Sequence, residues 1–328
     1  MTTSGTVATT VIDTASLMEH AFRRCKVLPN AQTPETVLIA RECLYMLMLN
    51  IGNTGLNLWC VEKAFMSLQA GAKTYVTAPG TLDVLNVIYS QPSLSTSVFS
   101  ATAQGGKATL PALTKNVRLG VQFSVAYTGA LTVKSSVDGL AYTTDSTVAS
   151  STYAAGQYYW FELANTSAML TYTVEGPVVT YPAVSDILVA SSVYDLPMSQ
   201  WNRDTYASIN AKDQQSRPST SYFYEKKLTP VLTLWPVPNN STDHLTIYRH
   251  RQPQDVGSLS QTLEIPQRWL DGFIWLLAAR LCFELPTVDP QVVQNVLAMA
   301  DKQSLDMVQS ETDGAQIFLT PAIRAYSA

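Results

Sequence analysis

An abrupt change in composition in the middle of the 328-residue chain limits what it can fold into more than any other feature. From about residue 90 to residue 190 the sequence is rich in Ser, Thr, Val, Tyr and Gly and poor in charge. Apolar and polar residues alternate over 117–126, 131–137, 158–163 and 169–174. A period of two predicts half-buried strands, and Asp138-Gly139 between two such runs predicts a hairpin. The segment therefore predicts a small all-β sandwich.

The segments on either side carry helical patterns instead. A first helix is expected from Asp13 or Thr14, which can cap it, and a second from Pro34, because Pro favours the first helical position. The second helix is apolar nearly all round in its C-terminal half, so it must be covered on more than one side. The spacing of apolar residues predicts a third helix over 57–70.

The second flanking segment begins with strands and ends with helices. Alternation predicts antiparallel strands over 222–228, 231–236 and 244–249. A long helix is expected after Pro266, and another begins at Pro290, where Asp289 is the cap. We therefore expect an α+β fold, a helical bundle with a small antiparallel sheet, interrupted by the inserted β-sandwich. The discontinuous host domain would comprise residues 1–89 and 191–311, the insert residues 90–190, and a C-terminal arm residues 312–328.

Charge is scarce over the whole chain. Only 14% of the residues are charged and 46% are hydrophobic, whereas about a quarter of the residues in a typical soluble domain are charged. Such a surface suggests coverage by neighbouring subunits, and a low-charge β domain would give the same figure. The net charge of −4 does not indicate a basic face that grips nucleic acid.

The residue types that perform catalysis or bind metals are scattered. His244 and His250 bracket one predicted strand and lie about 20 Å apart, too far to share a metal ion. The four cysteines form no CxxC pair, so we expect buried free thiols. No phosphate-binding glycine loop and no nucleophile elbow is present in the sequence. We therefore expect no enzyme, no cofactor and no metal, and we see no membrane span or secretion signal.

The run Tyr158-Tyr159-Trp160-Phe161 is the main cluster of aromatic residues in the insert. Alternate residues of a strand point to opposite faces, so at least one pair should lie in the core. Tyr158 and Trp160 are candidates for the exposed pair, available to a glycan or to another subunit.

The two flanking segments together resemble a known family, the head-to-tail adaptor or tail tubular ring proteins of podoviruses, the short-tailed bacteriophages. In the first segment the similarity lies in the helix pair with its Asn53-Thr54-Gly55 turn, and in Tyr75 with the Pro79-Gly80 pair after it. In the second it lies in the following stretches: Asp195-Leu196-Pro197-Met198-Ser199, Arg203-Asp204-Thr205-Tyr206, Arg217-Pro218-Ser219, Leu234-Trp235-Pro236-Val237-Pro238, Pro266-Gln267-Arg268-Trp269-Leu270 and Phe283-Glu284-Leu285-Pro286. The long β insert departs from the family pattern.

The resemblance implies a structural virion protein, a head-tail connector in the form of a dodecameric ring. It would join the portal protein to the tail nozzle and tail fibres at the head-tail junction, and it would be assembled in the cytoplasm of the host bacterium. The ring would line the DNA ejection channel without sequence-specific binding and without contact with a membrane. The C-terminal arm would bind the portal through Ile317, Phe318, Leu319 and Tyr326. The expected subunit interface consists of helix residues: Leu44, Leu47, Met48, Trp269, Phe273 and Leu277.

Three other functions stay open at this point. The first is a carbohydrate-binding adhesion protein that uses the β insert, with the helices as a scaffold. The second is a tail-associated hydrolase, which the lack of clustered His, Asp, Glu or Cys residues disfavours. The third is another structural part of a virion.

Overall fold

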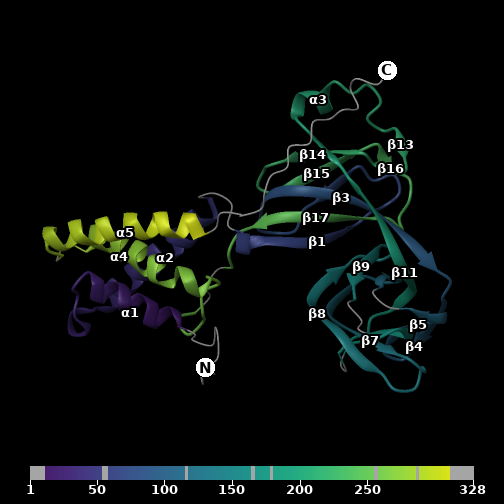
Figure 1. The fold of residues 1–328 in the computed structure, drawn as a ribbon, viewed down its shortest axis with the longest axis horizontal. Coiled ribbons are helices and arrows are strands. Elements are labelled where there is room, and N and C mark those ends of the chain that lie inside the picture. The colour runs from purple at the N-terminus through teal and green to yellow at the C-terminus, as the bar shows by residue number, and fades with distance from the viewer. Residues whose placement is uncertain are drawn as a thin grey trace, which may run out of the picture. The chain divides into compact units, whose positions relative to one another are not determined.

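A computed structural model describes residues 12–53, 58–114, 117–163, 167–177, 180–254, 258–285 and 288–310. The chain divides into two compact units (Figure 1). The helical unit contains both chain ends, residues 1–60 and 252–328, and the sheet unit is the continuous stretch Val61–Arg251. Among the described residues, no helix is both long enough and apolar enough to span a bilayer.

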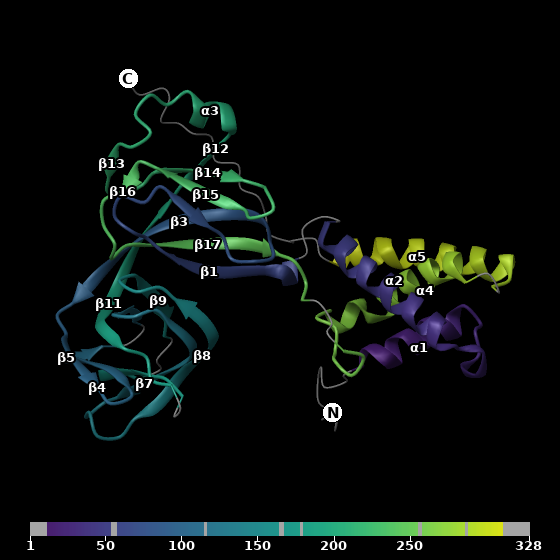
Figure 2. The ribbon, with the colours of Figure 1, turned by 180° about the vertical axis from the view of Figure 1, so that it is seen from behind.

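The helical unit is built around one central helix (Figure 2). Its α-helices are α1 (Thr14–Arg24), α2 (Pro34–Asn53), α4 (Leu270–Glu284) and α5 (Pro290–Ser310), with short 3-10 helices η1 (Pro29–Ala31), η2 (Leu58–Cys60) and η3 (Gln267–Trp269). The carboxylate of Asp13 accepts a hydrogen bond from the backbone N–H of Ser16, so Asp13 caps α1 as expected. Helix α4 packs against α1, α2 and α5, which explains why it is apolar on nearly every side.

The described residues of the sheet unit form four sheets and one short helix, α3 (Arg203–Ala207). The six-stranded sheet has the order β1 (Val61–Ser67), β17 (His244–Arg251), β3 (Thr81–Ser95), β11 (Val184–Pro197), β6 (Arg118–Phe123), β9 (Tyr158–Glu162). The five-stranded sheet has the order β4 (Val98–Thr102), β5 (Gly105–Thr114), β10 (Met169–Glu175), β7 (Tyr127–Ser136), β8 (Thr143–Tyr153). The four-stranded sheet has the order β12 (Ser199–Trp201), β14 (Ser221–Glu225), β15 (Val231–Trp235), β2 (Thr74–Val76), and β13 (Gln215–Ser216) pairs with β16 (Val237–Pro238).

The six-stranded sheet is shared by two hydrophobic cores. One core contains Leu245 and Ile247 of β17 together with Leu232 and Leu234 of the four-stranded sheet. The other contains side chains of β6 and β11 together with side chains of the five-stranded sheet. Strands β3 and β11 pair with each other over most of their length, so they connect the two cores. The sheet unit therefore consists of two sandwiches with one sheet in common.

The shared sheet is strongly curled, so that its two edge strands β1 and β9 approach each other. The ammonium of Lys63 on β1 and the carboxylate of Glu162 on β9 form an ion pair of 2.5 Å across this approach. The inner face of the curl holds a cluster of aromatic and polar side chains. The imidazole of His244 stacks on Trp160 with ring centroids 4.9 Å apart, and Phe65 meets the same imidazole edge-on.

The predicted fold class is wrong. The described chain is mostly β, with large sandwich-like sheets in place of a helical bundle with a small antiparallel sheet. The expected insert is also not a separate sandwich, because its strands β6 and β9 belong to the same sheet as β1 and β17. The boundaries expected near residues 90 and 190 fall inside the long strands β3 and β11. Backbone pairing between distant strands overrides the local change in composition.

The third predicted helix is also wrong, since Val61–Ser67 is strand β1. Leu58, Val61, Phe65 and Leu68 are spaced as on one face of a helix, but the short apolar run Ala64-Phe65-Met66 fits a strand as well. In the strand, Phe65 lies on the inner face of the curl near His244, whereas Met66 packs against the core on the other face. Short apolar segments that satisfy both periods cannot be assigned from periodicity alone.

Candidate functional site

The residues expected at a subunit interface lie inside the helical unit. Leu44, Leu47, Met48, Trp269, Phe273 and Leu277 are all buried members of its core. They contact other helices of the same chain, so the prediction that they form an intersubunit surface is wrong. The apolar side chains that are exposed on these helices are different ones: Leu38, Tyr45 and Met46 of α2, Phe283 of α4, and Leu305 and Val308 of α5.

The aromatic residues expected on the surface of the insert are also placed differently. Trp160 is only 3% exposed and is covered by His244, so it cannot stack on a glycan. Tyr158 is half-buried, and its hydroxyl donates a hydrogen bond to the carboxylate of Asp186 at 2.7 Å. Burial, and then this hydrogen bond to a carboxylate, raise the pKa of Tyr158. The residues of the expected portal-binding arm, Ile317, Phe318, Leu319 and Tyr326, lie outside the described residues.

An open cleft of about 370 Å³ lies within the sheet unit. Its walls come from β1, β2 and the turn after it, the start of β3, the end of β8, β9 with the turn before it, and β17. Strands β1, β2, β8 and β9 are all at the edges of their sheets. The cleft is therefore the place where three sheets end beside one another.

The cleft combines aromatic rings with uncharged hydrogen-bonding groups. The half-buried rings of Phe65, Tyr75 and Tyr159 contribute to its walls. The polar side chains that line it are Ser67, Thr77, Thr81, Thr152, Gln157 and Arg249. Ligand sites of small molecules have this composition, mainly apolar and aromatic with a few polar groups that fix orientation.

Several of these polar groups are already bonded within the protein. The hydroxyl of Tyr159 accepts a hydrogen bond from the backbone N–H of Ala154 and donates one to Oε1 of Gln157. The hydroxyl of Tyr75 donates to the carbonyl of Ala72 at 3.0 Å. Among the described contacts, the Ser67 hydroxyl and the Nε2 of Gln157 have no partner, so these two groups are available to a ligand.

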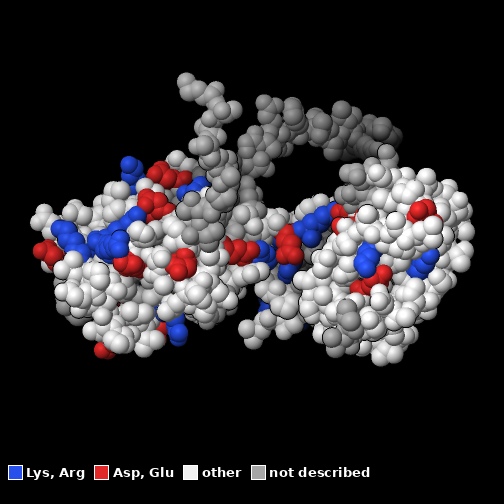
Figure 3. Space-filling model, turned by 90° about the horizontal axis from the view of Figure 1, so that it is seen from below, with Lys and Arg blue, Asp and Glu red and all other residues white. Residues whose placement is uncertain are grey.

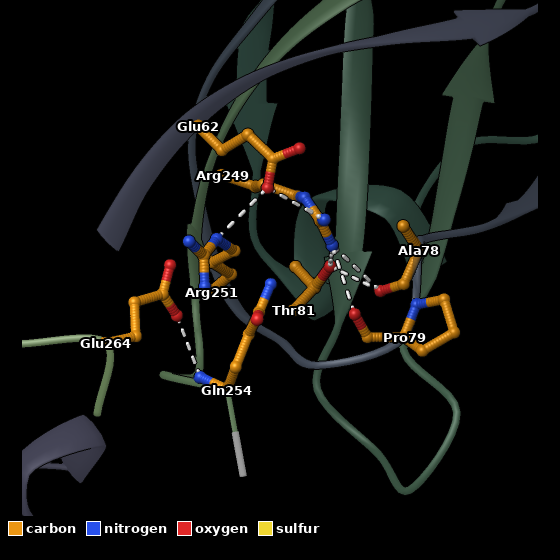
Figure 4. A network of polar contacts seen from close by, with 8 residues as sticks. All are labelled: Glu62, Ala78, Pro79, Thr81, Arg249, Arg251, Gln254 and Glu264. Carbon is orange, nitrogen blue, oxygen red and sulfur yellow. Dashed lines mark hydrogen bonds and ion pairs between the residues drawn. The ribbon is translucent and has the colours of Figure 1, made fainter. Parts of the chain in front are cut away.

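Arg249, whose contacts are drawn in Figure 4, is the one charged residue among the described residues that line the cleft. One guanidinium nitrogen donates to the carbonyls of Ala78 and Pro79, each at 3.2 Å, and to Oγ1 of Thr81 at 2.9 Å. The other terminal nitrogen donates to the carboxylate of Glu62 at 3.0 Å. Arg249 thus holds the turn between β2 and β3, which forms one wall of the cleft.

A second cavity of about 360 Å³ lies beside Arg118 in the same unit. The Arg118 guanidinium lies 3.6 Å from the Glu162 carboxylate and 3.7 Å from that of Asp195. It also donates a hydrogen bond to Nε2 of His244 at 3.1 Å. The hydrogen bond from Lys63 holds the pKa of Glu162 below its usual range. Glu162 is therefore ionised at neutral pH and is unsuited to act as a general acid there.

His244 is fully buried and uncharged. Because an arginine can only donate, Nε2 of His244 must accept the hydrogen bond from Arg118, which leaves the proton of the neutral ring on Nδ1. Burial, and then the positive charges of Arg118 and Lys63, lower the pKa of His244 to about 3. Among the described residues, no group of three or more His, Cys, Asp or Glu side chains is placed to hold a metal ion. On the face drawn in Figure 3, basic and acidic residues lie side by side without a large area of one sign.

Comparison with known proteins assigns no family. No family model matches the chain, and no curated protein matches its sequence. The solved structures similar to it include a family 29 carbohydrate-binding module, with 9% identity over 41% of this chain and 92% of that one and a TM-score of 0.20. Another is a carbohydrate-binding module of a family 31 glycoside hydrolase from Clostridium perfringens, with 10% identity over 39% of this chain and 91% of that one and a TM-score of 0.21. TM-scores this low do not indicate a shared fold or a shared ligand.

The cleft could not be found from the sequence. Its aromatic residues Phe65, Tyr75 and Tyr159 lie on three strands from two different sheets. The run of aromatic residues at 158–161 did indicate the right strand, but the residue that reaches the cleft is Tyr159, whereas Tyr158 and Trp160 were the ones predicted.

Proposed function

We propose that this chain is a non-enzymatic protein that binds carbohydrate in the cleft of its sheet unit. The observation that supports this proposal is the composition of the cleft, in which the rings of Phe65, Tyr75 and Tyr159 lie beside uncharged donors and acceptors. The face of a sugar ring is apolar and its edge carries hydroxyl groups. Aromatic rings and neutral hydrogen-bonding groups match these two properties.

The absence of catalysis is part of the same proposal. No Asp, Glu, His or Cys is among the described residues that line the cleft. Hydrolysis of a glycosidic bond commonly uses two carboxyl groups that flank it, one of them as an acid with a raised pKa. The cleft offers binding groups without such a pair.

Titration calorimetry of the full chain against a panel of oligosaccharides tests the proposal. The double variant Ser67→Ala, Gln157→Ala removes the two groups available to a ligand, and we expect about tenfold to hundredfold weaker binding from the loss of two hydrogen bonds. The matched control is Gln104→Ala, because Gln104 is an exposed glutamine of the same unit that does not line the cleft. No binding to any oligosaccharide, or equal weakening by the control, would refute the proposal.

A second function, a structural adaptor subunit of a virion, is favoured by a different observation. Several large apolar side chains are exposed on the helical unit, among them Leu38 and Tyr45, which lie two turns apart on α2, and Phe283 on α4. Exposed apolar groups that together form a contiguous patch commonly mark contacts with other proteins. This observation agrees with the ring that the podoviral resemblance implies, with the portal, nozzle and fibre proteins as partners and the head-tail junction as its location.

The mass of the purified protein in solution, alone and mixed with the portal protein of its phage, tests the second function. A mass that matches a ring, with the portal protein co-migrating, is the expected result. The variant Leu38→Glu, Tyr45→Glu should reduce assembly, while Gln294→Glu, a substitution at an exposed polar position of α5, should not. Deletion of residues 312–328 should abolish attachment to the portal. A protein that stays monomeric beside the portal would exclude the adaptor function and leave the carbohydrate proposal untouched.

A further inference from the structure

We infer that the ligand of the cleft is an uncharged sugar, and that Arg249 positions the cleft wall instead of binding an acidic group. This inference rests on the proposed carbohydrate function and specifies its ligand class. An arginine in a binding cleft is usually the group that pairs with a carboxylate or sulfate of a ligand. The contacts of Arg249 decide whether its donors are available for that purpose.

The terminal nitrogens of Arg249 are engaged by the protein, and its Nε–H is buried without a hydrogen-bond partner. Four hydrogen bonds join its two terminal nitrogens to Ala78, Pro79, Thr81 and Glu62, at 2.9 to 3.2 Å. Its side chain is only 12% exposed, and its Nε is fully covered by other atoms. A bidentate pair with a ligand carboxylate needs two N–H groups on one edge of the guanidinium, and no such edge is free.

Glu62 compensates the charge of Arg249. The same carboxylate oxygen that accepts from Arg249 also lies 3.3 Å from Nε of Arg251, so Glu62 is held between two guanidinium groups (Figure 4). Glu62 therefore weakens the attraction that Arg249 would exert on a carboxylate of a ligand. The remaining polar groups of the cleft are hydroxyls and an amide, which bind neutral sugars and acidic sugars equally well.

The inference makes a prediction about the effect of salt. Binding of an uncharged sugar involves no ion pair, so its affinity should change little between about 50 mM and 500 mM NaCl, whereas a charged ligand would bind more weakly as screening increases. The experiment uses the full chain and two sets of probes of equal length: neutral gluco- and manno-oligosaccharides, and oligogalacturonates. We expect the neutral set to bind and the acidic set to bind about tenfold more weakly or not at all.

The variant Glu62→Gln tests the role assigned to the carboxylate. It should leave affinity for the neutral probe unchanged within about twofold and should strengthen binding of the acidic probe about tenfold, because the positive charge of Arg249 is then uncompensated. The control is Glu225→Gln, which removes the same charge from an exposed site of the unit that does not line the cleft.

The possible outcomes distinguish an error about the charge of the ligand from an error about carbohydrate binding itself. Preferential, salt-sensitive binding of oligogalacturonates by the unmodified chain would overturn the inference while the carbohydrate function stands. An unchanged affinity of Glu62→Gln for the oligogalacturonates would show that Glu62 does not compensate the charge of Arg249. Failure of both probe sets to bind would refute the carbohydrate function itself. The comparison of probes and the salt series need no variant, so the test remains decisive if Glu62→Gln does not fold.

Discussion

Mild acid should destabilise the sheet unit before it affects the helical unit. The reason is that the surroundings of His244 in the folded chain disfavour the protonated imidazole. The imidazole is fully buried, stacks on Trp160, and lies 3.1 Å from the guanidinium of Arg118. Its pKa in the folded chain is about 3, against an ordinary value of 6.5. The proposed perturbation is a fall in pH, compared between the unmodified chain and the variant His244→Gln, which keeps an acceptor for Arg118 but does not titrate.

Stability should fall as the pH falls, because the pKa of His244 is lower in the folded state than in the unfolded state. The unfolded state binds the proton below about pH 6.5 and the folded state only near pH 3, so the stabilisation is present above 6.5 and is lost as the pH falls between the two values. Each pH unit in this window changes the free energy of unfolding by about 1.4 kcal/mol for one proton. Because the unfolded imidazole is already half-protonated at pH 6.5, the unmodified sheet unit should lose about 2 kcal/mol more than His244→Gln between pH 6.5 and about pH 4.5.

Urea unfolding at a series of pH values measures this difference. Circular dichroism at the helical band reports mainly on the helical unit, which contains α1, α2, α4 and α5, and serves as an internal control. Tryptophan fluorescence, with Trp160 beside the imidazole, also reports on the sheet unit. Burial also lowers the pKa of His250, so His250→Gln has to be measured in parallel.

An unchanged pH dependence in His244→Gln would refute the reasoning, since it would mean that the ring is not held neutral by its surroundings. A loss of stability confined to pH values below about 4 would instead indicate protonation of carboxylates, whose ordinary pKa values lie there.

Three further predictions concern packing and buried polar groups. Gly120→Ala should destabilise the sheet unit by about 1–3 kcal/mol in urea unfolding, because the new Cβ would lie 2.9 Å from the ring of Trp160; an unchanged midpoint would contradict this close contact. Arg217→Met should cost about 1–3 kcal/mol, because the fully buried carboxylate of Asp243 loses its half-exposed bidentate partner and keeps the hydrogen bond from Tyr89; a loss below about 0.5 kcal/mol would show that the pair is not needed. Burial raises the pKa of the thiols of Cys25 and Cys282, so a thiol reagent should modify them quickly only in denaturant, and rapid labelling of these two residues in the native chain, located by peptide mapping, would exclude their buried position.

Local features of the sequence were sufficient to place the longer helices and several of the strands. Asp13 caps α1 and Pro34 begins α2, and the capping position of Asp289 before α5 is also where expected. The Asp138-Gly139 pair joins β7 and β8, with Gly139 at φ +77° and the Asp138 carboxylate accepting backbone N–H groups of the turn. These features depend on residues within a few positions of each other, which is why the sequence alone reveals them.

The arrangement of these elements depends on contacts that no local pattern contains. β17 pairs with β3 across more than 150 residues of sequence, and β11 pairs with both β3 and β6. The same limit explains the error about the helices. A helix that is apolar all round, such as α4, predicts coverage on several sides, but the sequence does not say whether the cover comes from its own chain, as it does here, or from another subunit.

The position of the cleft among strand edges bears on the kind of ligand it can hold. An open strand edge can accept an extended peptide as an additional strand, and natural proteins prevent this by placing charged residues on the edge. Edge strand β1 carries Glu62 and Lys63, and Lys63 pairs with Glu162 on the opposite edge, so that one end of the gap between β1 and β9 is closed. A peptide that paired along β1 would have to break this ion pair. The other end, at Phe65 and Ser67, is part of the open cleft. A compact ligand held by side chains would leave this ion pair intact, as the proposed carbohydrate function requires.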